Sequence, residues 1–298
     1  MRYKNIFFSI FILSFIFSYK NLIYAKTKNF QNLEVSPVTQ ILNLNKGENY
    51  KSFITIINKT NSIEHIVIGV SGFRQYKKTN SPKFSKTINK NSISMHWFSI
   101  QNEVTLNPYQ KKKIPYTLSV PKNASAGGHF ASIVINEKDK KSQIIESIRP
   151  LFFINVQGKI QLTGFVKKFT TDKLFNYSGN IKFNTFFENT GNIEFAPFGF
   201  IIIKNIFGQV VGVVNVNKEK SLDLPKSIRQ YKSNFRDNSF FDTGVYSAQL
   251  ILNYGNTARV YNINKNITFY IINPIFILLL IIILISIIIY ILYKTKKV

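Results

Sequence analysis

Between residues 26 and 273, apolar residues recur in short runs, and many of these runs alternate with polar residues at every second position. Clusters of Asn, Gly, Ser, Pro or Lys separate the runs, and no segment shows the spacing of an amphipathic helix. A period of two is typical of strands, because successive side chains point to opposite faces of a sheet. The pattern therefore predicts an all-β fold.

The predicted strands form two groups. The first group covers 53–57, 63–70, 114–120, 130–135 and 148–156, and the second covers 160–166, 181–187, 198–203, 210–216, 228–235, 245–252 and 261–269. About seven strands in roughly 115 residues is the count of an immunoglobulin-like sandwich. We therefore predict two tandem immunoglobulin-like β-sandwiches, at 26–157 and 158–273. Segment 73–90 is polar, basic and contains Pro82, so we expect a long exposed loop there.

Both ends of the chain carry apolar runs that point to a membrane. Near the start, Arg2 and Lys4 precede an apolar run and then a polar stretch ending in Ala25, which is the order of a signal peptide (residues 1–25). We expect cleavage after Ala25. Residues 275–293 contain no charge and would form a helix of about 28 Å, close to the hydrocarbon thickness of a bilayer. With the basic tail 294–298 inside, the sequence predicts a single-pass plasma-membrane protein whose sandwiches are extracytoplasmic.

The chain is strongly basic, with 39 Lys and Arg against 14 Asp and Glu. Without the six basic residues of the two terminal segments, the predicted ectodomain still carries a net charge of +19. An AT-rich genome would also enrich lysine, and this alternative stays open. If the charge is functional, it favours an anionic partner beside the membrane. Candidate contacts for an anionic polymer are Lys77, Lys78, Lys111, Lys112 and Lys113, although ordinary solvation of a basic loop explains them equally.

The residues available for catalysis are few. There is no cysteine, which excludes disulfides and thiolate sites, and only three histidines, which excludes most zinc chemistry. No metalloprotease, serine hydrolase or phosphate-loop motif is present, so we expect no enzyme, no cofactor and no metal. A hydrolase built on distant carboxylates remains a minor alternative. Nucleic acid is not an expected partner, because basic and aromatic residues are scarcely interleaved.

Two residues are predicted to hold the corners of the sandwiches. Tyr246 follows a Gly-Val pair and precedes Ala248, Leu250 and Leu252 at even spacing, which is the setting of the tyrosine corner in immunoglobulin-like folds. His129 takes the corresponding place in the first group of strands. We expect both side chains to be packed and structural, with a ligand or catalytic role as the lesser alternative.

Several short motifs support a resemblance to a known family. They are Val35-Ser36-Pro37, residues 53–60, 104–108, 120–121 and 126–128 in the first domain, and 192–199, 224–225 and 244–246 in the second. Together with the order of leader, two sandwiches, transmembrane helix and basic tail, they resemble the WxL-interacting proteins of bacterial cell surfaces. The resemblance implies peptidoglycan contact by the first domain and contact with a protein partner or host surface by the second. Pilus chaperones share the pattern of the first domain but lack the C-terminal anchor.

The sequence thus favours a non-enzymatic, membrane-anchored adhesion or surface protein that binds cell-wall polymer, such as peptidoglycan, or another surface protein. The alternative is a chaperone-like or structural subunit of an envelope assembly that pairs strand edges, in which the charge is incidental. Neutralising Lys111, Lys112 and Lys113 separates these hypotheses, because only polymer binding should weaken.

Overall fold

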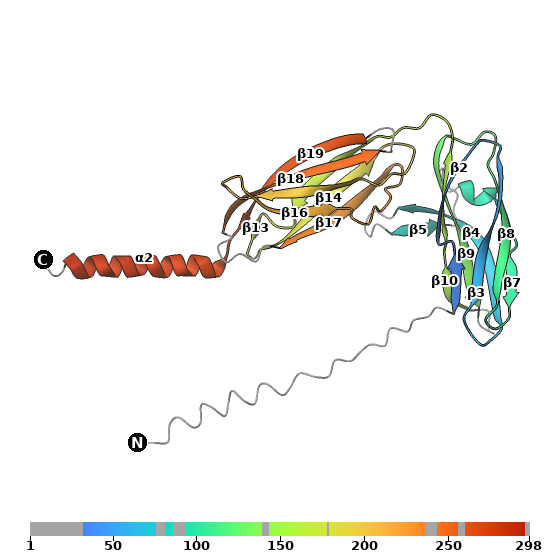
Figure 1. Cartoon of the computed structure of the whole chain (residues 1–298), viewed down its shortest axis with the longest axis horizontal. Helices are drawn as coiled ribbons and strands as arrows, with labels where there is room; N and C mark the ends of the chain where they lie inside the picture. Colours follow the sequence, from blue (N-terminus) through green and yellow to red (C-terminus); the bar gives the residue numbers. More distant parts are fainter. Residues whose placement is uncertain are drawn as a thin grey trace, which may run out of the picture.

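Figure 1 shows a computed structural model that describes residues 32–75, 81–85, 93–138, 143–177, 179–236, 243–255 and 260–295. The predicted cleavage site at Ala25, the candidate residues Lys77 and Lys78, and residues 296–298 of the predicted tail lie outside the described residues. The strands are β1 (Leu33–Ser36), β2 (Thr39–Leu44), β3 (Asn49–Asn58), β4 (Glu64–Gln75), β5 (Pro82–Ser85), β6 (Phe98–Ile100), β7 (Glu103–Leu106), β8 (Lys111–Ser119), β9 (Gly127–Lys138), β10 (Ile144–Ile148), β11 (Leu151–Val156), β12 (Gly164–Thr171), β13 (Phe175–Asn176), β14 (Asn180–Asn189), β15 (Phe198–Lys204), β16 (Val210–Val216), β17 (Ser227–Arg236), β18 (Gly244–Gly255) and β19 (Val260–Ile271). The helices are η1 (Ile93–Trp97), a 3₁₀ turn, and α2 (Pro274–Thr295).

The first sandwich packs the sheet β1-β3-β8-β6 against the sheet β2-β11-β9-β4-β5. β10 extends the second of these sheets beside β9, and β7 pairs with the start of β4. Apolar and polar residues alternate along the strands, so the apolar side chains point into the core. In β8, Ile114, Tyr116 and Leu118 are buried. Lys111 and Lys113 in the same strand are exposed. The first segment of the chain serves both sheets, because β1 pairs with β3 and β2 pairs in parallel with β11.

The second sandwich packs the sheet β12-β14-β17 against the sheet β13-β19-β18-β15-β16. Its core is rich in aromatic rings. Phe183, Phe187 and Phe269 have no exposed surface, and the Phe183 and Phe269 rings meet edge to face at 5.7 Å. Large rings bury much apolar area per residue, so a few of them fill most of the space between the two sheets.

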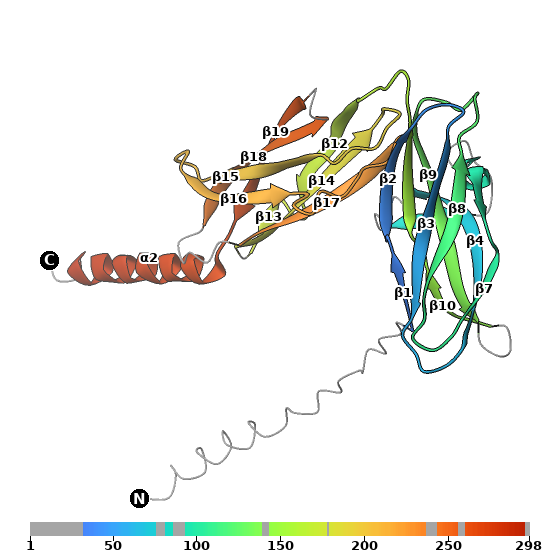
Figure 2. The same ribbon diagram turned by 45° about the vertical axis from the view of Figure 1, so that its right-hand side comes forward.

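The two sandwiches meet at an angle, so that the molecule is L-shaped, and α2 leaves the far end of the second sandwich (Figures 1 and 2). Residues Pro274–Tyr293 of α2 have a mean hydropathy of 3.6, and the most apolar stretch of this helix is not buried in the structure. Twenty residues of helix measure about 30 Å, which is enough to cross a bilayer. The prediction of an all-β chain followed by one apolar helix is confirmed.

The predicted loop at 73–90 is wrong in part. Phe73 belongs to β4 and is 3% exposed, and Pro82–Ser85 form β5, which pairs with Gly72–Gln75. The pattern was misleading because this hairpin contributes only two large apolar side chains, Phe73 and Phe84, to the core. The sequence also did not predict the short strands β1, β2, β6, β7, β10 and β13, since two to six residues carry little periodicity.

A glycine in each sandwich tests the packing of the sheets. A Cβ at Gly199 in β15 would lie 2.0 Å from the Ile251 carbonyl oxygen, so Gly199→Ala should lower the free energy of unfolding by about 1–3 kcal/mol. Gly69 in β4 has no atom within 4 Å of such a Cβ, so Gly69→Ala is the matched control and should be neutral or slightly stabilising. Thermal unfolding of the two variants measures the difference, and equal melting temperatures would contradict this packing.

Candidate functional site

A groove lies on the outer face of the second sheet of the first sandwich. Its volume is about 430 Å³, and it is lined by Val67, Gly69, Val70 and Ser71 of β4, Phe84 of β5, Val134 and Asn136 of β9, Ile144 of β10, and Arg149. An outward face of a sheet is ordinarily polar. Here Val67, Val134, Phe84 and Ile144 give the groove apolar walls beside its polar side chains, and Gly69 leaves its floor open because no atom lies within 4 Å of a would-be Cβ.

An unpaired strand edge borders this groove. β9 pairs along one half with β11 and along the other half with β10. β2 covers the outer side of β11, but no described strand covers the outer side of β10. Ile144 at the start of β10 is 59% exposed. The sheet therefore ends beside the groove in a five-residue edge, and an uncovered edge offers backbone donors and acceptors to another extended chain.

Arg149 connects the edge with the groove. It follows β10 directly, its guanidinium lies 4.7 Å from the centroid of the Phe84 ring, and its Nε donates a hydrogen bond to Ser147 Oγ at 3.3 Å. A guanidinium held over an aromatic face keeps its planar set of donors in a defined direction. The groove thus has a cationic end beside apolar walls.

Another part of the same sheet face packs against the second sandwich and forms the junction between the two sandwiches. Phe73, Phe130 and Phe153 form a cluster with ring centroids 5.5–5.8 Å apart, and Leu224 of the second sandwich is buried against them. This aromatic junction holds the angle of the L, and β5 projects toward it in Figure 1. The groove and the β10 edge lie on the same face of the same sheet as the junction.

Gln75, at the end of β4, joins the two sandwiches by hydrogen bonds. Its Nε2 donates to the Ile228 carbonyl at 3.0 Å, and its Oε1 accepts from the Leu224 amide at 3.2 Å and from Ser227 Oγ at 3.0 Å. The side chain is 7% exposed. A buried amide that uses both its donor and its acceptor fixes orientation as well as distance.

Two buried carboxyls flank the junction. Burial raises the pKa of Glu194 to about 7, and a Cβ at Gly128 of the first sandwich would lie 2.6 Å from its Oε2. Burial also raises the pKa of Asp223 to about 7, partly offset by its hydrogen bond from Ser227. Oε2 of Glu194 and Oδ2 of Asp223 have no hydrogen-bond partner, which explains why desolvation dominates both carboxyls.

Of the lysines in the predicted basic site, the structure describes Lys111, Lys112 and Lys113. Lys111, Lys112 and Lys113 are all exposed at the start of β8, in the sheet opposite the groove. The Lys113 ammonium lies 4.3 Å from the centroid of the Phe53 ring, and the charge of Lys111 acts on Glu34, whose carboxylate is paired with Lys59 at 2.6 Å.

The two predicted corner residues are buried. His129 is 5% exposed, its Nε2 donates to the Ser125 carbonyl at 2.8 Å, and its ring lies 4.6 Å from that of Trp97. Burial lowers the pKa of His129, so the neutral imidazole is favoured. Tyr246 is 6% exposed and stacks on Phe269 at 5.7 Å. Among the described residues, no group of three or more His, Asp or Glu side chains could hold a metal ion.

A second hollow, the polar trough, lies on the outer face of β12-β14-β17. Its volume is about 510 Å³, and its lining includes Lys168, Lys182, Lys232, Asn184, Gln230 and Phe186. Gln230 Nε2 donates to Asn184 Oδ1 at 2.7 Å, so the amides form a ladder across the two strands. The sequence did not predict this grouping, because Lys168 (beside Lys167), Lys182 and Lys232 belong to three separate strands, and only the pairing of the strands brings them together.

No family model matches the chain, and no curated protein matches it in sequence. Several of the solved structures that are similar to it are fimbrial chaperones or their complexes, and others are a PapD-like domain of human CEP192 and a family 123 glycoside hydrolase from Clostridium perfringens. They include the chaperone–tip adhesin complex of CFA/I fimbriae (12% identity, TM-score 0.42, covering 78% of this chain and 98% of that one). The CsuC–CsuE complex of Acinetobacter baumannii has 12% identity and a TM-score of 0.40, covering 81% and 98%. The TM-scores lie below 0.5, so we take no function from these structures. The resemblance to WxL-interacting proteins stays a prediction.

The buried carboxyls predict that stability depends on pH. As the pH rises from about 4 to 7, Glu194 and Asp223 lose their protons in the unfolded chain before they do in the folded chain, so stability falls. Between pH 5 and pH 8 the free energy of unfolding should drop by about 2–3 kcal/mol for each carboxyl. Urea unfolding across this range measures the drop. The double variant Glu194→Gln/Asp223→Asn should flatten it, whereas Glu103→Gln, at an exposed carboxyl, should not.

Proposed function

We propose that this protein is a membrane-anchored, chaperone-like or structural subunit of an envelope assembly, which binds an extended segment of a partner protein along β10. The observation that carries the proposal is the uncovered β10 edge beside a groove with apolar walls and a cationic end. An extended peptide added to a sheet edge gains affinity from backbone hydrogen bonds and specificity from pockets for alternate side chains.

The groove and the edge are placed for one ligand. A strand paired with β10 would extend the sheet, so every second side chain would point to the face on which Ile144, Val67 and Val134 lie. Apolar residues at alternate positions of the partner would cover these side chains. Arg149 at the end of β10 suits a carboxylate in the partner. The chemistry is binding, and the site needs no catalytic group.

The apolar helix α2 supports a site of action at a membrane surface. Its exposed side chains and its length fit a single span, and Lys294 follows Tyr293 at its end. With the lysine-rich tail inside, both sandwiches lie outside the cytoplasm at the plasma membrane. The partner is then an extracytoplasmic or exported protein.

Filling the groove tests this proposal. Gly69→Phe places a ring where no atom lies within 4 Å of the new Cβ, so the fold should survive while the groove is blocked. The probe is a library of twelve-residue peptides in which Val or Ile alternates with Ser or Thr, selected on the detergent-solubilised full chain. Selected peptides should bind at least about tenfold more weakly to Gly69→Phe, which is a loss of about 1.4 kcal/mol.

The matched control is Ser119→Phe, which adds the same ring to an exposed position on the opposite sheet and should leave binding unchanged. A second readout is amide hydrogen exchange at Ile144–Ile148, which should slow when a peptide pairs with β10. Peptides that bind without slowing exchange there would refute strand addition, and equal binding to both variants would refute the groove.

The polar trough favours a second candidate function, the binding of an anionic cell-wall polymer. Three lysines, the amides of Asn184 and Gln230, the ring of Phe186 and one carboxylate, Asp172, which accepts a hydrogen bond from Asn184, line one hollow of about 510 Å³. Cations set among amide donors suit the anionic and hydroxyl groups of a glycan polymer. Lys111, Lys112 and Lys113 remain the other candidate cluster for the same ligand.

Two triple variants of equal charge separate these clusters. Lys168→Gln/Lys182→Gln/Lys232→Gln should reduce salt-sensitive retention on purified wall polymer by several-fold, because it empties one hollow of its cations. Lys111→Gln/Lys112→Gln/Lys113→Gln should reduce it less, because these side chains share no hollow. Equal losses would mean that net charge alone is responsible, and no loss in either would exclude electrostatic binding.

A further inference from the structure

Large apolar side chains are exposed at one end of the second sandwich, in two separate segments. Phe175 belongs to the short strand β13, and Leu174 and Tyr177 flank this strand. Leu174, Phe175 and Tyr177 are 54%, 48% and 65% exposed. Ile206 and Phe207 form the turn between β15 and β16 and are 69% and 84% exposed. We call these five residues the apolar rim. Apolar residues gathered at one end of a soluble domain generally mark an interaction surface.

The first segment of the rim is bonded to the residues that lead into α2. The Tyr270 amide donates to the Leu174 carbonyl at 2.9 Å, and the Ile272 amide donates to the Asn176 carbonyl at 2.7 Å. Phe175 stacks on Tyr270 with ring centroids 5.0 Å apart. α2 begins at Pro274, two residues after Ile272. Because each residue of extended chain adds about 3.3 Å, Leu174–Asn176 lie close to the start of the apolar helix.

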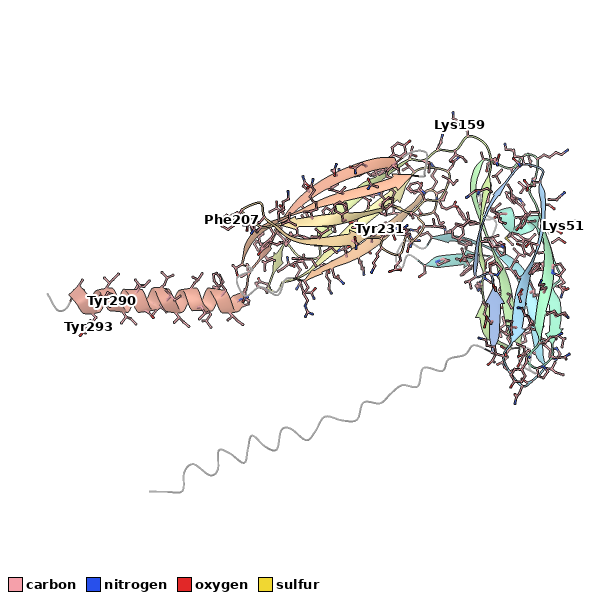
Figure 3. All side chains as sticks on the ribbon, in the orientation of Figure 1. Lys51, Lys159, Phe207, Tyr231, Tyr290 and Tyr293 are labelled. Atoms are coloured by element: carbon pink, nitrogen blue, oxygen red, sulfur yellow. The ribbon has the colours of Figure 1, made fainter. Side chains whose placement is uncertain are left out.

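Strand register brings the second segment to the same end. Lys204, the last residue of β15, pairs with Ser247, and Ser247 pairs with Thr268. The turn after Lys204 therefore continues past this row, toward the level of Ile271. It is a tight turn, in which the Phe207 amide donates to Asn205 Oδ1 at 3.0 Å and Gly208 has a φ of +78°. Figure 3 shows Phe207 at the end of the sandwich from which α2 leaves.

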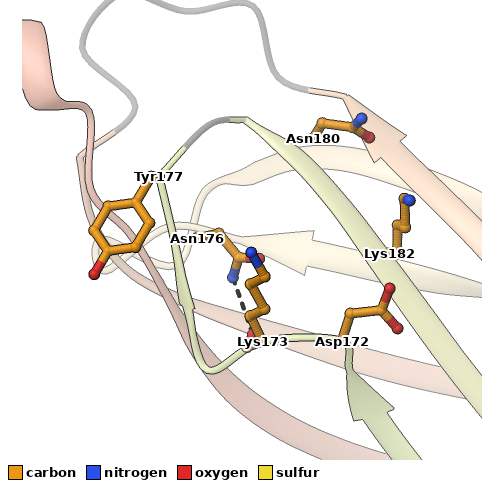
Figure 4. A pocket seen from close by; sticks show the side chains of 6 residues that line it. All are labelled: Asp172, Lys173, Asn176, Tyr177, Asn180 and Lys182. Atoms are coloured by element: carbon orange, nitrogen blue, oxygen red, sulfur yellow. Dashed lines mark hydrogen bonds between the residues drawn. The ribbon is translucent and has the colours of Figure 1, made fainter.

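Cations accompany the rim. A pocket of about 370 Å³ beside β13 is lined by Lys173, Lys182, Asn176, Tyr177, Asn180 and Asp172. In Figure 4 the Lys173 and Lys182 side chains come from different segments of the chain that meet at this pocket. Within the described part of this end, Lys204 and Arg236 add two further cations, and Asp172 is the single carboxylate.

We propose that the apolar rim lies in the headgroup region of the bilayer that α2 spans, with Lys173 and Lys182 next to anionic lipid headgroups. This inference rests on the proposed membrane anchorage. Aromatic side chains favour the interface between hydrocarbon and water, and lysines near the surface are attracted by anionic lipids. Two contact segments at opposite sides of the same five-stranded sheet, together with α2, fix the tilt of the second sandwich, whereas a helix on a free linker would let it rotate.

The orientation of the groove follows from this contact. Since the aromatic junction and Gln75 join the first sandwich to the second, a fixed tilt also sets the direction in which the groove and the β10 edge face the membrane. Contact of the rim with the bilayer thus determines how the groove and the β10 edge are oriented toward the membrane.

Fluorescence of single tryptophans in the full-length chain tests the contact. In a Trp97→Phe background, one tryptophan is placed at the rim (Phe207→Trp), on an exposed turn of the first sandwich (Tyr109→Trp) or in α2 (Leu284→Trp). The chains are reconstituted in phosphatidylcholine vesicles whose lipids carry bromine either near the headgroup or deep in the acyl chain. Should Trp97→Phe unfold the first sandwich, Trp97 is retained and its emission is subtracted as the blank.

Phe207→Trp should lose at least about half of its emission to bromine near the headgroup and less to deep bromine, as expected for an interfacial ring. Tyr109→Trp should be unaffected, and Leu284→Trp should be quenched by deep bromine. If Leu284→Trp is quenched and Phe207→Trp is not, the rim does not touch lipid and the inference is overturned. If Leu284→Trp is not quenched either, the membrane anchorage itself is overturned.

The role of the lysines has its own readout. Adding phosphatidylglycerol to the vesicles should increase the quenching of Phe207→Trp, because anionic headgroups draw this end toward the surface. The increase should vanish in Lys173→Glu/Lys182→Glu and persist in Lys111→Glu/Lys112→Glu, a pair of equal charge in the first sandwich. An increase of the same size in both pairs would overturn the assignment to Lys173 and Lys182.

Discussion

The junction between the two sandwiches is the contact on which the rest of this structure depends. Leu224 packs against three phenylalanines of the first sandwich, and Gln75 uses its donor and its acceptor on the same short segment of the second. Apolar packing supplies most of the free energy, whereas the amide selects a single orientation. Without both, the groove, the strand edge and the membrane end of the chain would have no fixed relation to one another.

The outer face of the second sheet of the first sandwich has two parts. One half is buried by the junction, and the other half remains open as the groove with the β10 edge beside it. The buried carboxyls Glu194 and Asp223 add a dependence on proton concentration to the junction, since both are held where water cannot solvate their charge.

In the proposed arrangement, a membrane holds the other end of the molecule. α2 leaves the second sandwich almost directly, and the apolar rim and the lysines gather around its starting point. The proposed binding site would then be held at a defined angle to the bilayer through the junction and the proposed lipid contact. Binding by strand addition benefits from this, because an incoming strand needs a fixed direction as well as a free edge.

The sequence alone determined the features that depend on neighbouring residues. The period of two marks β8 and β18, and an uncharged run of nineteen residues marks α2, because side-chain direction and helix length follow from local geometry. The sites depend instead on pairs that are distant along the chain. Gln75 and Ser227 are 152 residues apart, the lysines of the trough come from three strands, and β10 is an edge only because β2 covers β11 and stops there. No local pattern contains such information; the pairing and packing of the whole chain decided it.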